Sequence, residues 1–264
     1  MGSLWISDIK PVMMTDDIAF VGGTPVSVHV IIGRGGLILL DAGYDYMAEG
    51  IAAGMAALGL DIRDVKYILH THGHVDHYSG TAQLVRMSGA KTLIGAEDVP
   101  IVSGRLNMSW AKELNLPRPE PFVPDFTFKD GDILRLCGRT IRCVHAPGHT
   151  PGTYAFFIET AVDGMPMTAA MHGGVGLNTL SRDALARYNL PLSLRDEFRK
   201  GLHALAEKRV DVVLGNHCQY NDTAGKVARM GSGHNPFVDT CEWPRFLSQC
   251  ERELDDLIKS ETHR

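Results

Sequence analysis

His72-Gly73-His74-Val75-Asp76-His77 follows, after His70 and Thr71, on Lys66–Leu69, a mainly apolar run that predicts a β-strand. In an extended segment, residues two apart point the same way, so the first two histidines can converge on one metal ion. The aspartate and the last histidine come after the chain begins to turn, so they can serve a second ion nearby. Imidazole and carboxylate are ligands that zinc uses in open catalytic sites. The stretch therefore predicts a metal centre at the end of a strand.

Two further histidines occupy similar positions in the second half of the chain. His149 follows the predicted strand Thr140–His145 in a turn-rich segment, and His217 follows the predicted strand Val210–Leu214. Open sheets usually build their sites at the carboxyl ends of strands. One short loop cannot saturate two ions, so we expect both histidines to be metal ligands.

The combination of motifs resembles the metallo-β-lactamase superfamily. The motifs are HxHxDH after an apolar strand, APGHTPG at 146–152 and a strand that ends in GNH at 215–217. The resemblance runs from about Ile18 to the C-terminal helix. It implies an α+β fold, a four-layer αββα sandwich, which we expect to form a single domain over residues 1–264. It also implies two Zn²⁺ ions per chain at the edge of the two sheets.

The resemblance assigns three ligands to each ion. The first zinc would take His72, His74 and His149, and the second would take Asp76, His77 and His217. Asp76 would also be catalytic, because it orients the nucleophile while it binds metal. Asp41 matches an aspartate of the family that stabilises the metal-binding loop without itself binding the metal. The alternative is a role in a turn or as a helix cap.

The strand before residue 172 narrows the choice within the superfamily. Glyoxalase II and lactonase types carry an aspartate there that bridges both metals, whereas this chain has no Asp or Glu between Asp163 and Asp183. A site of five histidines and one aspartate is similar to the third subclass of metallo-β-lactamases, and so is Asn235-Pro236-Phe237-Val238-Asp239. Gly174 departs from that subclass, which often has a serine. His172 is either a seventh ligand or a residue beside the site; we favour the second reading.

The implied chemistry is hydrolysis. Two ions about 3.5–4 Å apart share a water and lower its pKa toward 7, and the metal-bound hydroxide opens a cyclic amide or ester such as a β-lactam or a lactone. The alternatives are a thioesterase of the glyoxalase II type, an iron-containing redox enzyme and a non-catalytic binding protein. The two ions would carry a charge of +4, against one anionic ligand and a hydroxide. Because the site then has an excess of positive charge, we expect an anionic small-molecule substrate. Expected substrate contacts lie in Val102–Pro124 and around Asn178 and Tyr220.

The composition excludes several other classes. The chain has 264 residues, 44% of them hydrophobic and 22% charged, so global disorder is excluded. A net charge of −5 argues against a nucleic-acid partner, and no apolar run is long enough to span a membrane. The first residues show no signal-peptide pattern, and five cysteines at irregular spacing suit a reducing compartment. We therefore expect a cytoplasmic protein. The pattern decides neither its oligomeric state nor the pairing of Cys218, Cys241 and Cys250.

The periodicity predicts two β-rich halves, each followed by helices, and hence two sheets face to face with helices outside. An apolar stripe predicts a helix through Met47, Ile51, Met55 and Leu58, and a second stripe predicts a C-terminal helix after a capping box at Asp239 and Glu242. The other predicted helices are Thr81–Met87 and Leu192–Glu207. The other predicted strands are Ile18–Val21, Ser27–Ile32, Leu37–Leu40, Thr92–Ile94, Ile133–Leu136, Tyr154–Ile158 and Met167–Met171.

Overall fold

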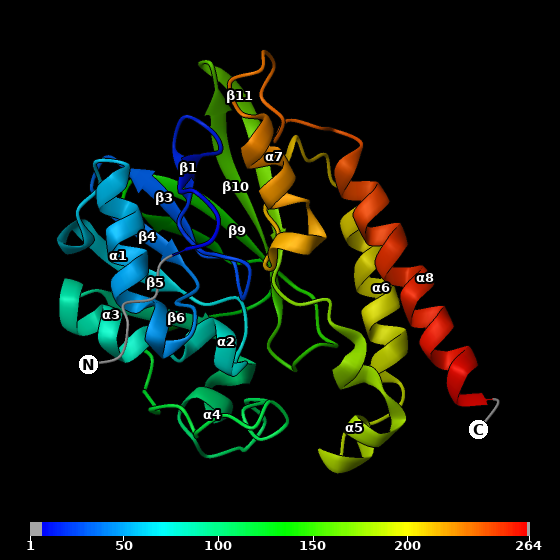
Figure 1. Ribbon diagram of the computed structural model, residues 1–264. Helices are drawn as coiled ribbons and strands as arrows, with labels where there is room; N and C mark the ends of the chain where they lie inside the picture. The colour runs from blue at the N-terminus through cyan, green and yellow to red at the C-terminus, as the bar shows by residue number, and fades with distance from the viewer. Residues whose placement is uncertain (1–6, 263–264) are drawn as a thin grey trace.

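The computed structural model describes residues 7–262. Residues 1–6 and 263–264 lie outside the described residues. The first of these ranges belongs to the stretch in which we expect no signal peptide. Two β-sheets lie face to face in the middle of the molecule, with helices on both outer sides (Figure 1). The predicted αββα sandwich is confirmed.

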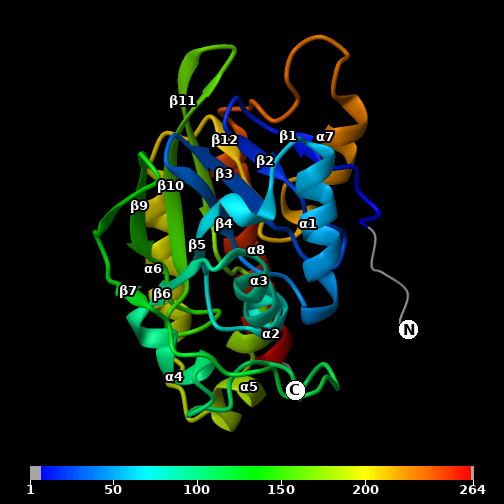
Figure 2. The ribbon, with the colours of Figure 1, turned by 90° about the vertical axis from the view of Figure 1, so that its left-hand side faces the viewer.

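Each sheet is built mainly from one half of the chain. The first sheet has the order β1-β2-β3-β4-β5-β6-β7 and the second has the order β12-β11-β10-β9-β8 (Figure 2). The first consists of β1 (Val12–Met13), β2 (Ile18–Phe20), β3 (His29–Gly33), β4 (Gly36–Leu40), β5 (Val65–Leu69), β6 (Lys91–Gly95) and β7 (Phe126–Phe128). The second consists of β8 (Ile133–Leu136), β9 (Arg139–His145), β10 (Tyr154–Val162), β11 (Met165–His172) and β12 (Val212–Val213).

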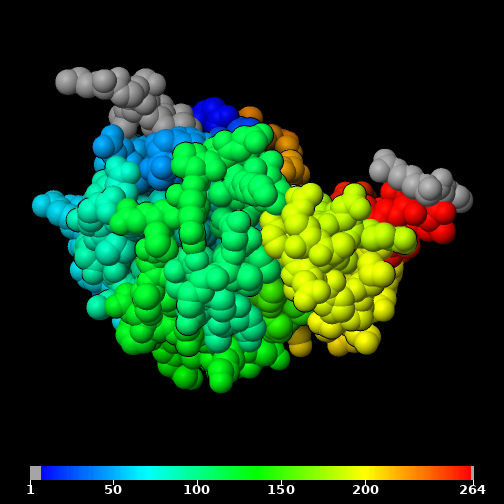
Figure 3. Space-filling model, turned by 90° about the horizontal axis from the view of Figure 1, so that it is seen from below, coloured from blue at the N-terminus to red at the C-terminus, as the bar shows by residue number. Residues whose placement is uncertain are grey.

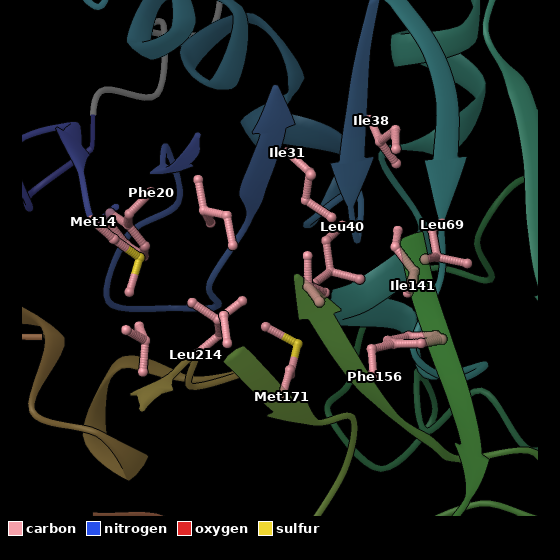
Figure 4. Close-up of a cluster of buried hydrophobic side chains, with 14 of the residues drawn as sticks. Met14, Phe20, Ile31, Ile38, Leu40, Leu69, Ile141, Phe156, Met171 and Leu214 are labelled. Carbon is pink, nitrogen blue, oxygen red and sulfur yellow. The ribbon is translucent and has the colours of Figure 1, made fainter. Parts of the chain in front are cut away.

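Three apolar layers hold the sandwich together. The central layer lies between the sheets, where Phe20 and Leu40 of the first sheet meet Phe156 and Met171 of the second (Figure 4). A second layer joins the first sheet to its outer helices, and a third joins the second sheet to α6 and α8. The longer helices are α1 (Ala48–Ala57), α3 (Thr81–Ser88), α6 (Leu194–Ala206) and α8 (Glu242–Thr262). Apolar stripes on these helices therefore serve as the outer layers' packing faces.

Strand direction brings the functional loops to one edge of each sheet. Strands β4, β5, β6 and β7 run parallel, so the loops after them leave in the same direction. In the second sheet β11 is parallel to β12, and β9 also shares its direction because β10 is antiparallel to both β9 and β11. All the motif histidines follow strands of these two sets, so the topology gathers them as expected.

Some elements differ from their predicted bounds. The predicted strand Val210–Leu214 is regular only as β12, although Leu214 N still donates to Ala170 O at 2.8 Å. Strands β10 and β11 are longer than predicted because Asp163 and Gly164, at φ 53° and 75°, close a tight hairpin turn between them. Four short helices were not predicted: α2 (Val75–Tyr78), α4 (Val99–Val102), α5 (Arg182–Arg187) and α7 (Thr223–Arg229).

The predicted capping box at the start of α8 is wrong. The Asp239 carboxylate accepts from Cys241 N at 2.9 Å, but the Glu242 carboxylate does not fold back to Asp239. It accepts instead from Lys226 Nζ at 2.5 Å. A largely buried ammonium is the stronger partner, because its desolvated charge must be compensated.

Two further predictions concern the whole chain. All five cysteines are free, in agreement with the expectation of reduced thiols. Within residues 7–262, every helix is too short or too polar to cross a membrane.

Buried His29 in β3 predicts an acid sensitivity of the fold. Its ring is fully buried beside Phe20, and neither ring nitrogen has a hydrogen-bond partner among residues 7–262. Burial lowers the pKa of His29 from 6.5 to about 4, against the opposing effect of Asp41. Because the unfolded chain binds a proton below pH 6.5 and the folded chain does not until about pH 4, stability is lost as the pH falls through this window.

We expect His29→Leu to reduce this loss. Between pH 7 and pH 5, the free energy of unfolding of the variant should fall by about 2 kcal/mol less than that of the wild type. Urea unfolding of both metal-free proteins at the two pH values measures the difference. Equal losses in the two proteins would show that His29 is not held neutral.

Candidate metal centre

The six predicted ligands converge where the two sheets meet. His72 and His74 lie in the loop after β5, and Asp76 and His77 lie on α2, which begins immediately afterwards. His149 comes from the loop after β9 and His217 from the loop after β12. They form two groups, and the ligand atoms of each group lie within 4.8 Å of one another. The first group is His72, His74 and His149, and the second group is Asp76, His77 and His217.

The first group leaves a buried nitrogen without a partner. Thr71 Oγ1 donates to Asp41, so the Thr71 oxygen accepts from His72 Nδ1 at 3.0 Å. His72 Nε2 then carries a lone pair, and it is buried with no hydrogen-bond partner among residues 7–262. His74 Nδ1 and His149 Nε2 face each other at 2.8 Å, and the three rings are within 4.8 Å of one another. Unpaired buried nitrogen is costly unless something absent from the chain binds it.

The second group forms a nearly regular triangle. Asp76 Oδ2 lies 3.4 Å from His77 Nε2 and 3.3 Å from His217 Nε2, and the two nitrogens are 3.4 Å apart. Ligand atoms on one tetrahedral zinc are themselves ~3.4 Å apart, since each zinc–ligand bond is about 2.0–2.1 Å. The ring centroids of His72 and His77 are 4.2 Å apart, so the two groups are neighbours. The donor set and its spacing therefore fit two divalent ions.

Asp41 holds the ligand loop in place. It follows β4 in the left-handed region at φ 66°, and its carboxylate is buried. Oδ1 accepts from Thr71 N at 2.8 Å, and Oδ2 accepts from Thr71 Oγ1 at 2.9 Å and from His77 Nδ1 at 2.7 Å. These bonds fix the His77 tautomer so that Nε2 faces Asp76 and His217. These contacts connect Asp41 to the ligand loop, and its supporting role at a metal centre stays a prediction.

Backbone carbonyls orient two more of the histidines. His149 Nδ1 lies 2.7 Å from Gly176 O, and His217 Nδ1 lies 3.2 Å from Pro25 O, so the Nε2 atom of each ring faces its group. The His149 ring is also pressed against the backbone of Gly174. A Cβ atom at Gly174 would lie 2.5 Å from His149 Cδ2. A serine at Gly174 is therefore incompatible with this position of His149.

Burial keeps most of these imidazoles neutral. It lowers the pKa of His72 and His74 well below 6.5, with neighbouring imidazoles adding to the effect, and lowers the pKa of His149 to about 4. Burial also lowers the pKa of His217. Burial acts in the same direction on His77, but Asp76 and Asp41 outweigh it and raise the pKa of His77. Neutral imidazole is the form that binds a metal ion, so His72, His74, His149 and His217 are already in the ligating state at neutral pH, whereas the raised pKa of His77 favours its protonated form.

A cavity of about 260 Å³ opens onto both groups. The loop of residues 103–125, most of the predicted Val102–Pro124 segment, covers it with Trp110 and Leu114. The predicted contacts Asn178 and Tyr220 both line it, and Tyr220 packs 5.9 Å from the His217 ring. Sequence reasoning missed further lining residues. They include Tyr44 and Gln219, which belong to no motif, and Asn216, which lies in the GNH motif but was not expected to line the cavity.

The covering loop is fastened across the site to α5. Glu113 accepts from Tyr188 Oη at 2.6 Å and from Arg187 Nη1 at 3.0 Å. From below, the green segment that follows α4 lies against the yellow segment of α5 and α6 (Figure 3). This contact places the Trp110 ring 5.9 Å from the His74 ring.

His172 lies beside the two groups and belongs to neither among the described residues. It is buried at the end of β11, Gly174 N donates to its Nδ1 at 3.3 Å, and its ring lies 6.1 Å from that of Phe198. Burial, with a smaller contribution from His149, lowers the pKa of His172 to about 3. Its role outside the ligand set stays a prediction.

A larger cavity lies at the opposite end of β11. It has a volume of about 670 Å³ and contains none of the six candidate ligands. Its lining mixes Arg139 and Arg209 with Asp17 and Asp211, which pair with them. Volume therefore does not identify the reactive site; the donor atoms do.

The fold and the ligand groups define a metallo-hydrolase-like centre, and comparison with known proteins identifies its family. The model of the Metallo-beta-lactamase superfamily matches residues 21–161, more than half of the chain. The chain belongs to this superfamily. The structure is similar to BJP-1, a subclass B3 metallo-beta-lactamase of Bradyrhizobium japonicum, with 26% identity, a TM-score of 0.88 and coverage of 99% of this chain and 98% of that one. The predicted resemblance to the third subclass is thus confirmed.

Other similar proteins include a further metallo-beta-lactamase and two curated hydrolases. FEZ-1 from Legionella gormanii has 23% identity and a TM-score of 0.88 over 98% of each chain, which supports the fold alone. A hydroxyacylglutathione hydrolase, GloC of Haemophilus influenzae, is 31% identical over 120 residues, 45% of this chain and 56% of its own length. A probable metallo-hydrolase of Burkholderia pseudomallei is 30% identical over 141 residues, 49% of this chain and 46% of its own length. The chain thus spans about half the length of these curated relatives, whose names agree with the predicted metal-dependent hydrolase.

Proposed function

We propose that this protein is a dinuclear zinc-dependent hydrolase that opens a small cyclic amide or ester, such as a β-lactam or a lactone. The observation that carries the proposal is the pair of adjacent three-ligand groups at the edge of the sheets. Five imidazoles and one carboxylate suit zinc better than an iron redox centre. All six side chains are in place, which argues against a binding protein without catalysis.

The substrate would bind over the histidines. When bound, two divalent ions would supply Lewis acidity that polarises a carbonyl and lowers the pKa of water toward about 7. Residues of the chain itself would orient the attacking water and exclude bulk solvent. Asp76 accepts a hydrogen bond from the attacking water and orients it, and Trp110 and Leu114 exclude bulk water from the cavity.

The side chains that line the cavity indicate how a charged substrate could be bound. Its described lining includes Asn178, Gln219 and Tyr220, but neither lysine nor arginine. Attraction of an anion would therefore depend on the excess positive charge of the metal centre, with amide groups as hydrogen-bond donors to a substrate carboxylate. We propose an anionic small molecule, with no nucleic acid partner.

A thioester hydrolase is the second candidate, because two of the curated relatives are named as hydroxyacylglutathione hydrolases. The end of β11 argues against it. His172 stands where hydrolases of the glyoxalase II type carry a bridging aspartate, and it belongs to neither ligand group.

A hydrolysis panel on zinc-loaded protein tests the proposal. It should compare β-lactams, homoserine lactones, thioesters and phosphodiesters. We expect the highest kcat/KM for a β-lactam or a lactone. Preference for the thioester would favour the second candidate, and no turnover on any of them would contradict hydrolysis of these classes.

We also propose a cytoplasmic location, supported by the five free cysteines. Fractionation of the native host tests it, and recovery from an exported fraction would contradict it.

His172→Ala tests the assignment of the ligand set. We expect the variant to keep both zinc equivalents, because neither group uses His172. Its zinc affinity should change by less than the about 10–100-fold that loss of a residue orienting a ligand costs. Loss of one equivalent would instead identify His172 as a ligand. Zinc content and affinity should be measured on the same preparation.

A further inference from the structure

Asp98 lies behind the first ligand group and has no part in the ligand set. It follows β6 at the start of α4, and its carboxylate is fully buried. Burial raises the pKa of Asp98 to about 6, against the opposing effect of its hydrogen bonds, so the group is ionised at neutral pH. A buried charge of this kind needs strong compensation.

Three donors supply that compensation, and they come from the two loops that carry the first group. Gly73 N, between His72 and His74, donates to Oδ2 at 2.7 Å. From the His149 loop, Thr150 Oγ1 donates to Oδ2 at 2.6 Å and Gly152 N donates to Oδ1 at 2.7 Å. One carboxylate thus ties together loops that are more than seventy residues apart in the sequence.

The glycines beside these ligands fit the same arrangement. A Cβ atom at Gly152 would lie 2.6 Å from Asp98 Cγ, which no side chain tolerates. A Cβ atom at Gly73 would lie 3.3 Å from Asp98 Oδ2 and 3.1 Å from Ile101 Cβ, both tight contacts. The glycines of the two motifs thus leave room for the Asp98 carboxylate to reach the backbone.

We infer that Asp98 is a positioning residue for the first ligand group: it fixes the separation of His72 and His74 from His149 and so sets the affinity of that group for its metal ion. The inference rests on the proposed metal centre. Asp98 makes no bond to the loop of His217, so its effect on the second group is smaller.

Asp98→Asn tests this with little change in volume. The asparagine amide has one acceptor oxygen, so its NH₂ must face either Gly73 N or Gly152 N, and the connection between the two loops loses at least one hydrogen bond. Zinc affinity, measured by competition with a chromophoric chelator, is the readout. We expect about a 10–100-fold loss when the first group alone is present, in a His217→Ala background. In a His149→Ala background, where the second group remains, we expect no comparable loss.

Two further variants serve as controls. Asp125 also accepts from a backbone N–H and a threonine hydroxyl, both of Thr92 at the other end of β6, so Asp125→Asn should leave both affinities unchanged. If Asp98→Asn does not fold, Thr150→Val removes a single donor and should weaken the first group selectively.

The outcomes separate the inference from the proposed function. Equal losses in both backgrounds would show that Asp98 only supports the fold, and no loss in either would also overturn the inference. If the unmodified protein binds no zinc, the proposed metal centre fails and the inference falls with it.

Discussion

Asp76→Asn is expected to slow hydrolysis by at least ~100-fold. Asp76 is the only anionic side chain among the six candidate ligands, and its Oδ2 lies 3.3 Å from His217 Nε2 and 3.4 Å from His77 Nε2. The amide keeps the shape of the side chain but loses its charge. Both the affinity of the second group and the orientation of the attacking water should therefore suffer.

The measurement is kcat/KM together with zinc content. Asp64→Asn is a matched control, because Asp64 is exposed and lies just before β5, at the end of that strand away from the ligands. Its kinetics should equal those of the wild type. Near-normal rates and full zinc occupancy in Asp76→Asn would show that the carboxylate has no role in binding or catalysis.

Removal of metal is expected to abolish turnover and to destabilise the fold. The buried His72 Nε2 has no other partner among residues 7–262, so the loaded state gains bonds that the apo state lacks. Binding at 1,000 times the dissociation constant stabilises the folded state by about 4 kcal/mol, which raises Tm by on the order of 10 °C for a chain of this size.

Thermal unfolding and activity should be followed through one cycle of chelation, dialysis and zinc addition. We expect both to fall and both to recover. Full turnover after exhaustive chelation, or recovery with iron alone, would contradict a zinc-dependent hydrolase.

The sequence predicted the layers because alternating apolar strands and helical stripes are local signals. It also predicted which six side chains come together, since each lies a few residues beyond a strand, and parallel strands bring such positions to one edge. The resemblance to a known family supplied what spacing could not, namely the assignment of His149 to the first group and of His217 to the second.

Other features depend on contacts that local patterns do not encode. Trp110 lies over His74 because Glu113 reaches Tyr188 and Arg187, more than seventy residues away. Asp98 is equally inconspicuous, because its role appears only when two distant loops are seen to converge on it. One local signal was overlooked: Asp163-Gly164 between apolar runs predicts the tight turn that extends β10 and β11.

We expect each of the two groups of three candidate ligands to hold one zinc ion. Elemental analysis of purified, zinc-saturated protein after removal of free metal tests it most directly, alongside His149→Ala and His217→Ala. The expected result is two zinc ions per chain in the unmodified protein and one in each variant. A reproducible value of zero in the unmodified protein, or iron in place of zinc with redox turnover, would contradict it.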